Sequence, residues 1–311
     1  MTAPTLIKRK PSKDNEKIDE SPEKDKLKYG PMPNFPYQRV WSRGIIIVGV
    51  VIYLWYFSKQ GKETVLASHK DVLNNRGQTF DCDSEYTKDI EVFPNCVPKT
   101  CGRYVTDKLV TEMEALTLLD MAKKGFAFGG SSGGASILDI HSGALSYKDK
   151  FVNMHTINEA NNLFNPEFIN TYKTVKEKIQ HAIAELFQIE PNNLFLTHPT
   201  FFSKLTNAEP KTSHDKYWLV HIDKETYESF HYTALLYLSD YGADFKGGRF
   251  IFKDIPSNKT VEPKLGRVSM FTSGGENVHF VERVTTGTRY AITISFTCDI
   301  KSSINVPTIR N

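Results

Sequence analysis

The sequence predicts an α+β protein in which helices support a β-rich C-terminal part, preceded by a single transmembrane helix. Three observations lead to this fold class. An uncharged apolar run covers residues 44–57, and two stretches with helical spacing follow it. From Leu194 onward, short β-branched and aromatic runs alternate with turns. Many short strands after two helices favour a sandwich or barrel with helices packed outside it.

Composition places the chain among ordinary globular proteins. Its 311 residues are 40% hydrophobic and 24% charged, which is enough apolar material for a buried core. The formal net charge is only +3, and the charges are mixed along the chain rather than gathered in a basic stripe. We therefore expect no nucleic-acid partner.

Residues 1–40 are rich in Lys, Glu, Asp and Pro and poor in aliphatic side chains. Such a segment buries too little apolar surface to offset its loss of conformational entropy, so we expect a disordered tail. More Lys and Arg precede the apolar run than directly follow it. This asymmetry predicts a cytoplasmic tail and a lumenal C-terminal part, in the endoplasmic reticulum or Golgi.

The apolar run is interpreted as a transmembrane signal anchor over residues 41–58. As a helix this segment is about 27 Å long, which suits a thin bilayer. Trp41 and Trp55 can lie at the two interfaces, and Arg43 can reach outward. A cleaved signal peptide and a buried core helix are the alternatives, but forty residues precede the run and no cleavage site directly follows it.

Residues 59–105 are expected to form a stem that disulfides could hold. An even number of cysteines permits two disulfides in any of three pairings. A zinc site, from the C-x4-C spacing, and free thiols are the alternatives. The sequon that begins at Asn258 leaves glycosylation open. The cysteines are Cys82, Cys96, Cys101 and Cys298.

A helical support region is expected over residues 106–192. Thr111 and Glu114 form a capping box for a helix over residues 112–124, and Gly125 ends it. Residues 126–160 are glycine-rich and expected to be irregular. A second helix begins after Asn165, and its apolar residues recur at helical spacing as a packing face: Phe168, Tyr172, Val175, Ile179, Ile183 and Leu186.

The β-rich core is expected over residues 193–300, followed by a C-terminal tail over 301–311. Within it, β-branched and aromatic runs separated by turns predict short strands. These runs are residues 217–222, 232–238, 249–252, 268–272, 278–282 and 290–297.

The candidate metal ligands are His221, Asp223 and His279. Residues two apart in a strand point to the same face, so the side chains of His221 and Asp223 converge. His279 lies on a later predicted strand and supplies the third ligand. Two imidazoles and one carboxylate occupy one face of a metal ion and leave positions open, which suits non-haem Fe(II).

Arg289 is the candidate partner for a carboxylate, ten residues after His279. Its planar guanidinium matches the two oxygens of a carboxylate group. Thr293 falls on the same strand face, and the Tyr237 phenol could add a hydrogen bond. His214, Asp215 and His231 compete for ligand roles, but neither histidine fits the spacing and strand-face pattern.

The segment 194–297 resembles the catalytic domain of the prolyl 4-hydroxylase-like 2-oxoglutarate oxygenases. The residues that carry this resemblance are YWLVHID (217–223), HYTALLYLSDY (231–241), GGRFIF (247–252), the turn from Pro263 to Gly266, NVH (277–279) and GTRYAITISF (287–296). Within this group, the chain most resembles the family called 2-oxoglutarate and iron-dependent oxygenase domain-containing protein 3, whose members are single-pass membrane proteins.

The resemblance implies a double-stranded β-helix, or jelly roll, and an Fe(II)- and 2-oxoglutarate-dependent dioxygenase. His221, Asp223 and His279 match the iron ligands, and Arg289 matches the residue that binds the far carboxylate of 2-oxoglutarate. Tyr237 and Thr293 match positions that assist it. O2 is the second co-substrate, ascorbate the reductant, and succinate and CO2 are released. The implied substrate is a prolyl or lysyl side chain of an unidentified secretory-pathway protein. Many collagen-type prolyl hydroxylases have Lys where Arg289 stands, which weakens an inference of collagen.

Three other functions fit parts of the sequence. Residues 129–133 fit G-x-S-x-G around Ser131, and the pattern recurs around Ser132, but no strand and helix flank it as a hydrolase needs. A metal-stabilised jelly roll in the lumen could act as a non-catalytic binding module. A cupin-type enzyme would use another co-substrate. The sequence leaves the substrate, the oligomeric state and the organelle open.

Overall fold

The computed structural model describes residues 36–59, 63–157, 165–212 and 215–307. The chain forms two compact units, residues 1–57 and residues 58–311. Most of the expected N-terminal tail, His214 and the last four residues of the expected C-terminal tail lie outside the described residues.

The described part of the first unit consists mainly of helix α1 (Gln38–Lys59). The segment Gln38–Phe57 has 20 residues and a mean hydropathy of 1.7, and none of it is buried against protein. By length and composition, this helix is able to cross a membrane.

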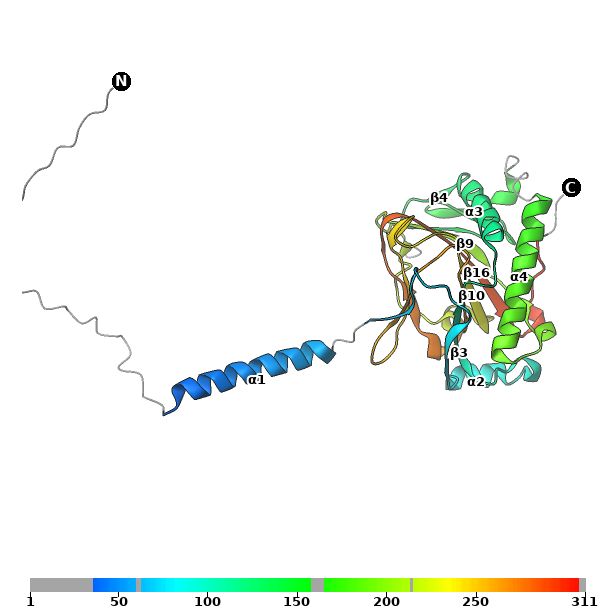
Figure 1. Ribbon diagram of the computed structural model, residues 1–311. Coiled ribbons are helices and arrows are strands. Elements are labelled where there is room, and N and C mark those ends of the chain that lie inside the picture. Colours follow the sequence, from blue (N-terminus) through cyan, green and yellow to red (C-terminus); the bar gives the residue numbers. More distant parts are fainter. Residues whose placement is uncertain (1–35, 60–62, 158–164, 213–214, 308–311) are drawn as a thin grey trace, which may run out of the picture. The chain divides into compact units, whose positions relative to one another are not determined.

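The second unit is mostly β-sheet and has a jelly-roll-like arrangement of two sheets, with helices on the outside (Figure 1). The small sheet has the order β1-β13-β12-β15, and the main path of the large sheet is β2-β3-β14-β10-β16-β9-β5-β6-β4. Strands β8 and β11 also pair with β16, and β7 pairs with β6.

The small-sheet strands are β1 (Thr64–Ala67), β12 (Phe250–Phe252), β13 (Lys259–Val261) and β15 (His279–Val281). The large-sheet strands are β2 (Arg76–Phe80), β3 (Cys101–Thr106), β4 (Gly130–Ser131), β5 (Ala135–Leu138), β6 (Ala144–Lys148), β7 (Lys150–Asn153), β8 (Phe195–Leu196), β9 (Phe201–Thr206), β10 (Tyr232–Tyr237), β11 (Phe245–Gly247), β14 (Val268–Thr272) and β16 (Val284–Thr297).

Strand β10 shows how the large sheet separates two cores. Ala234 and Leu236 pack into the core shared with the helices. Leu235 and Tyr237 point the other way, into the core shared with the small sheet. This alternation follows from the two-residue period of a strand. Both faces of β10 are buried, and Thr233 is its one polar residue.

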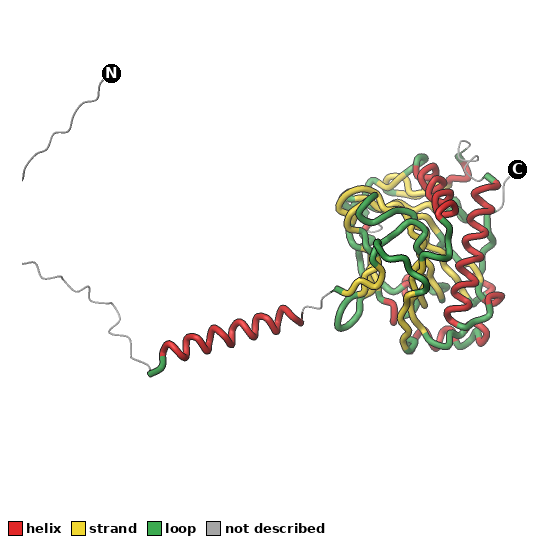
Figure 2. Tube along the Cα trace, in the orientation of Figure 1, coloured by secondary structure: helices red, strands yellow, loops and turns green. Residues whose placement is uncertain are grey.

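Helices α3 (Glu112–Phe126) and α4 (Pro166–Phe187) pack side by side on the outer face of the large sheet (Figures 1 and 2). Both predicted helix starts are confirmed: Thr111 and Glu114 form the capping box, and the Asn165 side chain caps α4. Helix α3 continues past Gly125, and Phe187 rather than Leu186 completes the buried face of α4. A short helix, α2 (Ser84–Ile90), and the single turn α5 (Asp223–Thr226) complete the set.

The expectation of a stem over residues 59–105 differs from the structure. Strand β1 joins the small sheet, and β2 and β3 join the large sheet. Leu66, Leu73 and Val105 are buried between the sheets, so this segment is part of the core. Its short strands carry too few apolar residues to show this in the sequence.

Two further local predictions were wrong. Residues 126–160, expected to be irregular, contain strands β4 to β7. These strands have two to five residues, too few for a clear period, and depend on pairing with β9 and with each other. Residues 217–222, expected to form a strand, contain only an isolated bridge between His221 and His279. Leu219 and Val220 are exposed there and have no partner strand.

The four cysteines form two disulfides, Cys82–Cys101 and Cys96–Cys298. The first closes a separation of 19 residues and the second a separation of 202. The second therefore ties the N-terminal part of the unit to the end of β16. No cysteine is left free for a zinc site.

Candidate active site

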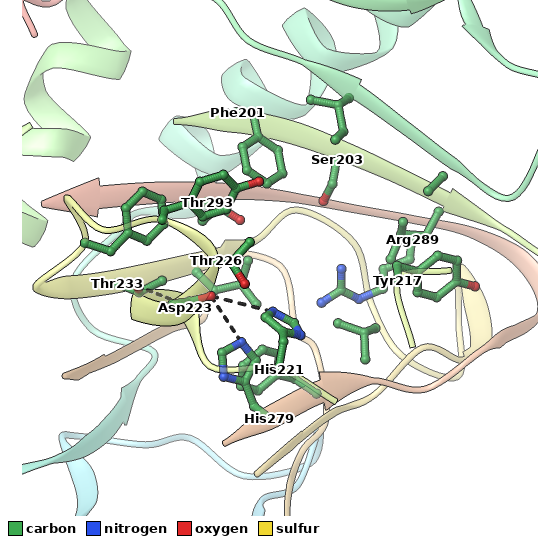
Figure 3. Close-up of a pocket in the computed structure, with 18 of the residues that line it drawn as sticks. Phe201, Ser203, Tyr217, His221, Asp223, Thr226, Thr233, His279, Arg289 and Thr293 are labelled. Carbon is green, nitrogen blue, oxygen red and sulfur yellow. Dashed lines mark hydrogen bonds and ion pairs between the residues drawn. The ribbon is translucent and has the colours of Figure 1, made fainter. Parts of the chain in front are cut away.

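The side chains of His221, Asp223 and His279 meet at one end of the space between the sheets (Figure 3). Their ligand atoms lie within 4.8 Å of one another. Oδ1 of Asp223 is 3.6 Å from Nε2 of His221 and 3.5 Å from Nε2 of His279. Asp223 and His279 are buried, whereas His221 is partly exposed at the mouth.

Backbone pairing places the two histidines next to each other. The amide of His221 donates to the carbonyl of His279, and the amide of His279 donates to that of His221, both at 3.0 Å. Asp223 begins α5 directly after this bridge. The expected convergence of His221 and Asp223 is therefore present, but a bridge followed by a helical turn produces it, not a continuous strand.

The outer nitrogens of both imidazoles are held by backbone carbonyls. Nδ1 of His221 lies 3.0 Å from the Leu219 carbonyl oxygen, and Nδ1 of His279 lies 2.8 Å from that of Asn277. A carbonyl can only accept, so each Nδ1 carries the proton. In the neutral rings, each Nε2 then presents a lone pair toward Asp223.

Charge and burial set the protonation states of the three groups. Burial acts to raise the pKa of Asp223, but His279, His221 and the Thr233 hydroxyl outweigh it and hold that pKa below its usual range. Burial lowers the pKa of His279 against the opposing charge of Asp223. For His221 burial acts the same way, but Asp223 and the Leu219 carbonyl stabilise the protonated ring and raise its pKa. An ionised carboxylate and a neutral buried imidazole are the forms that bind a metal ion.

A pocket of about 230 Å³ opens beside the three side chains, with walls from both sheets. Strands β5, β9, β10, β14 and β16 supply one wall, and β12 and β15 supply the other. Its other lining residues are mainly apolar or carry hydroxyls, including Phe201, Ser203, Tyr217, Thr226, Tyr227 and Thr293.

Arg289 lies in this pocket, and its guanidinium points into the space shared with the three ligands (Figure 3). The residue is buried, yet its Nε and Nη2 have no hydrogen-bond partner among the described residues. The Tyr237 ring lies 5.5 Å from the guanidinium carbon, and its hydroxyl is 3.1 Å from Ser269 Oγ. Burial raises the pKa of Tyr237 to about 12, so the phenol is neutral. Buried donors of this kind are normally satisfied, which indicates that an anionic group completes the site.

The structure thus brings together five of the six predicted site residues in one pocket, and Tyr237 packs beneath Arg289 without lining it. Two of the three competitors, Asp215 and His231, are engaged elsewhere, and His214 lies outside the described residues. Asp215 accepts hydrogen bonds from Ser131 and from the amides of Lys211 and Thr212. His231 pairs with Asp89.

The hydrolase pattern does not form a nucleophile elbow in this structure. Ser131 ends the two-residue strand β4, and its hydroxyl donates to Asp215 at 2.7 Å. Residues 132–134 lead to β5 and not to a helix. The pattern belongs to a loop held by Asp215.

Thr233 is a site residue that the sequence patterns did not predict. Its hydroxyl donates to Oδ2 of Asp223 at 2.7 Å (Figure 3). Two-residue alternation from Tyr237 and Leu235 places Thr233 on the same inner face of β10. A polar residue on that face, two strand positions from an apolar core residue, was the signal available in the sequence.

The donor set fits a divalent transition metal bound with a carboxylate ligand. Two imidazole lone pairs and one carboxylate oxygen converge with no bridging proton donor among the described residues. These electron pairs repel each other, and a bound cation would remove the repulsion. The unsatisfied nitrogens of Arg289 fit the far end of a dicarboxylate. Both halves of the site are therefore consistent with iron and 2-oxoglutarate.

Comparisons with known proteins show what this chain is similar to. A family model described as the 2OG-Fe(II) oxygenase superfamily matches residues 210–297. The chain is 48% identical over 275 residues to 2-oxoglutarate and iron-dependent oxygenase domain-containing protein 3 of Xenopus tropicalis, covering 86% of each protein. It is 46% identical over 71 residues to prolyl 3-hydroxylase 2 of Homo sapiens, covering 22% of this chain and 10% of that protein. A solved prolyl hydroxylase from Trichoplax adhaerens is 13% identical with a TM-score of 0.43, over 68% of this chain and 92% of that one.

Proposed function

Since this chain belongs to the family of 2-oxoglutarate and iron-dependent oxygenase domain-containing protein 3, we propose that it hydroxylates an uncharged side chain of a secretory-pathway protein. The enzyme class, a 2-oxoglutarate-dependent dioxygenase, follows from the family. The observation that supports the site assignment is one pocket holding both the three converging ligands and the unpartnered, buried Arg289.

In this proposal His221, Asp223 and His279 hold Fe(II), and Arg289 binds the far carboxylate of 2-oxoglutarate. Bound iron supplies the redox chemistry that couples decarboxylation of 2-oxoglutarate, with release of succinate and CO2, to hydroxylation by O2. The protein orients the co-substrate between the ligands and Arg289, and its apolar walls exclude water. Tyr237 supports Arg289 from below, and Thr293 offers a hydroxyl to the co-substrate. We expect ascorbate to keep the iron reduced.

The charges of the pocket favour an uncharged target, such as a prolyl side chain, over a lysyl one. Among the described residues that line the pocket, Asp223 carries the only carboxylate. One of its oxygens would bind the metal, and the other accepts a hydrogen bond from Thr233. A lysyl ammonium would therefore enter beside Arg289 and a metal cation without an anionic partner. The partial similarity to a prolyl 3-hydroxylase points in the same direction.

The mouth of the pocket favours a polypeptide substrate. Leu219 and Val220 directly precede His221, and their exposed fractions are 56% and 47%. Tyr227 is also exposed and lines the pocket. Exposed apolar side chains beside a catalytic opening are suited to contact residues that flank the target side chain.

The proposed location rests on α1 and on the disulfides. Disulfides persist in oxidising compartments such as the lumen of the endoplasmic reticulum. An anchor at residues 41–58, with the N-terminal tail cytoplasmic, would place the catalytic unit in that lumen. We propose a single-pass membrane protein of the endoplasmic reticulum or Golgi whose partner is an unidentified protein substrate and not a nucleic acid.

The full chain in detergent tests the proposal by succinate release in the presence of Fe(II), 2-oxoglutarate and ascorbate. We expect slow turnover without substrate, abolished in His221→Ala and Asp223→Ala. His181→Ala is the matched control, because His181 is exposed on α4. Arg289→Lys should raise the KM for 2-oxoglutarate by about tenfold, since Lys keeps the charge but loses the second hydrogen bond.

Peptide libraries that differ only in a central Pro, Leu or Lys then test the substrate. Stimulation of turnover by Pro or Leu but not by Lys is the expected result. A folded, iron-loaded protein that neither binds 2-oxoglutarate nor makes succinate would contradict the assigned activity and favour the binding-module alternative. Stimulation by Lys alone would contradict the electrostatic selection.

A further inference from the structure

We propose that Thr233, supported by Ser273, is a positioning residue that restricts Asp223 to a single oxygen for metal binding. The inference rests on the proposed iron site and concerns residues outside the three ligands. Thr233 lies on the inner face of β10, and Ser273 directly follows β14, the neighbouring strand. All three residues are buried.

The two oxygens of Asp223 have different surroundings. Oδ1 faces the two imidazoles, 3.6 Å from Nε2 of His221 and 3.5 Å from Nε2 of His279. Oδ2 faces away from them and accepts the Thr233 hydroxyl proton at 2.7 Å (Figure 3). The carboxylate is therefore rotated so that only one oxygen lies at the point where the ligand atoms converge.

The donor order follows from the chemistry of the groups. An ionised carboxylate only accepts hydrogen bonds, so the Thr233 hydroxyl must donate its proton to Oδ2. The Thr233 and Ser273 oxygens are 2.9 Å apart. Since the Thr233 proton is already committed, Ser273 must be the donor to Thr233. Two hydroxyls in series polarise each other and strengthen the bond to the carboxylate.

Ser273 also fixes the backbone beside Asp223. Its carbonyl accepts the amide of Lys224 at 3.0 Å, and its own amide donates to the His231 carbonyl at 3.0 Å. The residue thus holds the Asp223–Lys224 segment through the main chain and through the Thr233 hydroxyl. Such a double restraint limits both the position and the rotation of the carboxylate.

The functional consequence concerns the number of open coordination positions. A metal ion held by these three protein ligands would have its remaining positions open to the co-substrates. A carboxylate bound through both oxygens would take one of these positions. By engaging Oδ2, Thr233 keeps that position available to the co-substrates. Loss of the hydroxyl should therefore weaken 2-oxoglutarate binding, although Arg289 is untouched. It should also weaken metal binding, because the hydrogen bond that orients the Asp223 carboxylate is lost.

The test measures Co(II) binding to the full chain in detergent, without turnover. Thr233→Val keeps the shape of the side chain and removes the hydroxyl, whereas Thr233→Ser keeps the hydroxyl. We expect Thr233→Val to weaken Co(II) binding about 10- to 100-fold and to alter the visible spectrum of bound Co(II), with Thr233→Ser close to the wild type. In Co(II)-loaded Thr233→Val, the Kd for 2-oxoglutarate should rise about tenfold.

Thr200→Val is the matched control. Its hydroxyl is also buried, but it donates to the Thr197 carbonyl and accepts the Ser295 amide, and no hydrogen bond among the described residues joins either of these to the three ligands. We expect a loss of stability with unchanged Co(II) affinity and spectrum. If Thr233→Val does not fold, Ser273→Ala tests the same role. Because Ser273 acts on Asp223 through Thr233, we expect a smaller loss of Co(II) affinity, about three- to tenfold.

The outcomes separate this inference from the proposed function. Wild-type protein that binds no Co(II) would overturn the metal site itself. Wild-type protein that binds Co(II), with Thr233→Val equal to it in affinity, spectrum and 2-oxoglutarate binding, would overturn only the role of Thr233. If Thr233→Val cannot be folded, an unchanged Ser273→Ala would overturn it.

Discussion

At the scale of single residues, the pocket depends on neighbours that hold the functional side chains in place. The Leu219 and Asn277 carbonyls orient the two imidazoles. Thr233 orients the carboxylate. Arg289 is packed rather than hydrogen-bonded, because its Nε and Nη2 are unsatisfied by the described residues. Its position therefore depends on the groups in contact with its aliphatic stem.

Gly248 is one of these contacts and carries the first prediction. Its φ is +63°, and a Cβ there would lie 3.1 Å from Arg289 Cδ and 3.0 Å from the Phe245 and Val284 side chains. Gly248→Ala should therefore displace Arg289. We expect a loss of about 1–3 kcal/mol in the free energy of unfolding and a roughly tenfold higher Kd for 2-oxoglutarate. Denaturant unfolding and ligand titration measure the two effects.

Gly242→Ala is the control for backbone strain alone. Gly242 has a φ of +85°, and a Cβ added there would have no heavy atom within 4 Å beyond its chain neighbours. We expect this variant to lose stability without a change in 2-oxoglutarate affinity. Equal affinity losses in both variants would show that strain, and not contact with Arg289, is responsible.

At the scale of elements, α3 and α4 support the sheet that carries Arg289 and Thr293. Glu114 contributes to both helices. It closes the capping box at the start of α3 and binds Lys178 of α4 at 2.7 Å. Burial acts to raise the pKa of Glu114, but Lys178 and Thr111 outweigh it and lower that pKa, so the carboxylate is charged at neutral pH.

Thr111→Ala tests the cap. The Thr111 hydroxyl accepts the Glu114 amide at the start of the helix, and Ala leaves that amide without its partner. We expect a loss of about 1 kcal/mol in the free energy of unfolding, with the KM for 2-oxoglutarate unchanged. Thr117→Ala is the control, because its hydroxyl bonds only the Met113 carbonyl within the helix. A loss in Thr117→Ala as large as that in Thr111→Ala would argue against the cap as the cause.

At the scale of the whole molecule, residues distant in sequence meet around His231. His231, directly before β10, contacts Cys298 of the disulfide between Cys96 and Cys298. Its Nδ1 accepts the Cys298 amide at 3.1 Å, and its Nε2 faces Asp89 at 2.8 Å. The imidazole is therefore neutral, with its proton on Nε2.

This arrangement predicts loss of stability in acid. Burial and the nearby Lys224 lower the pKa of His231 to about 4 from 6.5, against the opposing charges of Asp89 and Asp299. The unfolded chain takes up this proton more readily than the folded one. The stability that the neutral His231 contributes is therefore fully present above pH 6.5 and is lost as the pH falls toward 4. At pH 5 the loss in the free energy of unfolding is about 2 kcal/mol. The free energy of unfolding, measured from pH 7 to pH 5, should fall less in His231→Gln than in the wild type. An identical pH dependence in the two proteins would contradict this assignment.

Local chemistry explains which parts of the fold could be predicted from the sequence. Caps at Thr111 and Asn165 and long helical periods predicted α3 and α4, because these signals lie within the helices themselves. The runs at residues 232–238 and 268–272 predicted β10 and β14 almost to the residue. The short strands β1 and β4 to β7 escaped prediction because partners elsewhere in the chain stabilise them.

The same distinction applies to the site. Residue type and spacing predicted the candidate ligands and Arg289, because H-x-D and the two-residue period of β16 are local properties of the chain. Only the tertiary structure decided that His221 and His279 are joined by a backbone bridge, that Asp223 begins a helical turn, and that Cys96 pairs with Cys298. Only it revealed Thr233 and Ser273 behind Asp223. The physical reason is that these contacts join segments far apart in sequence, so their energies arise only when the sheets pack together.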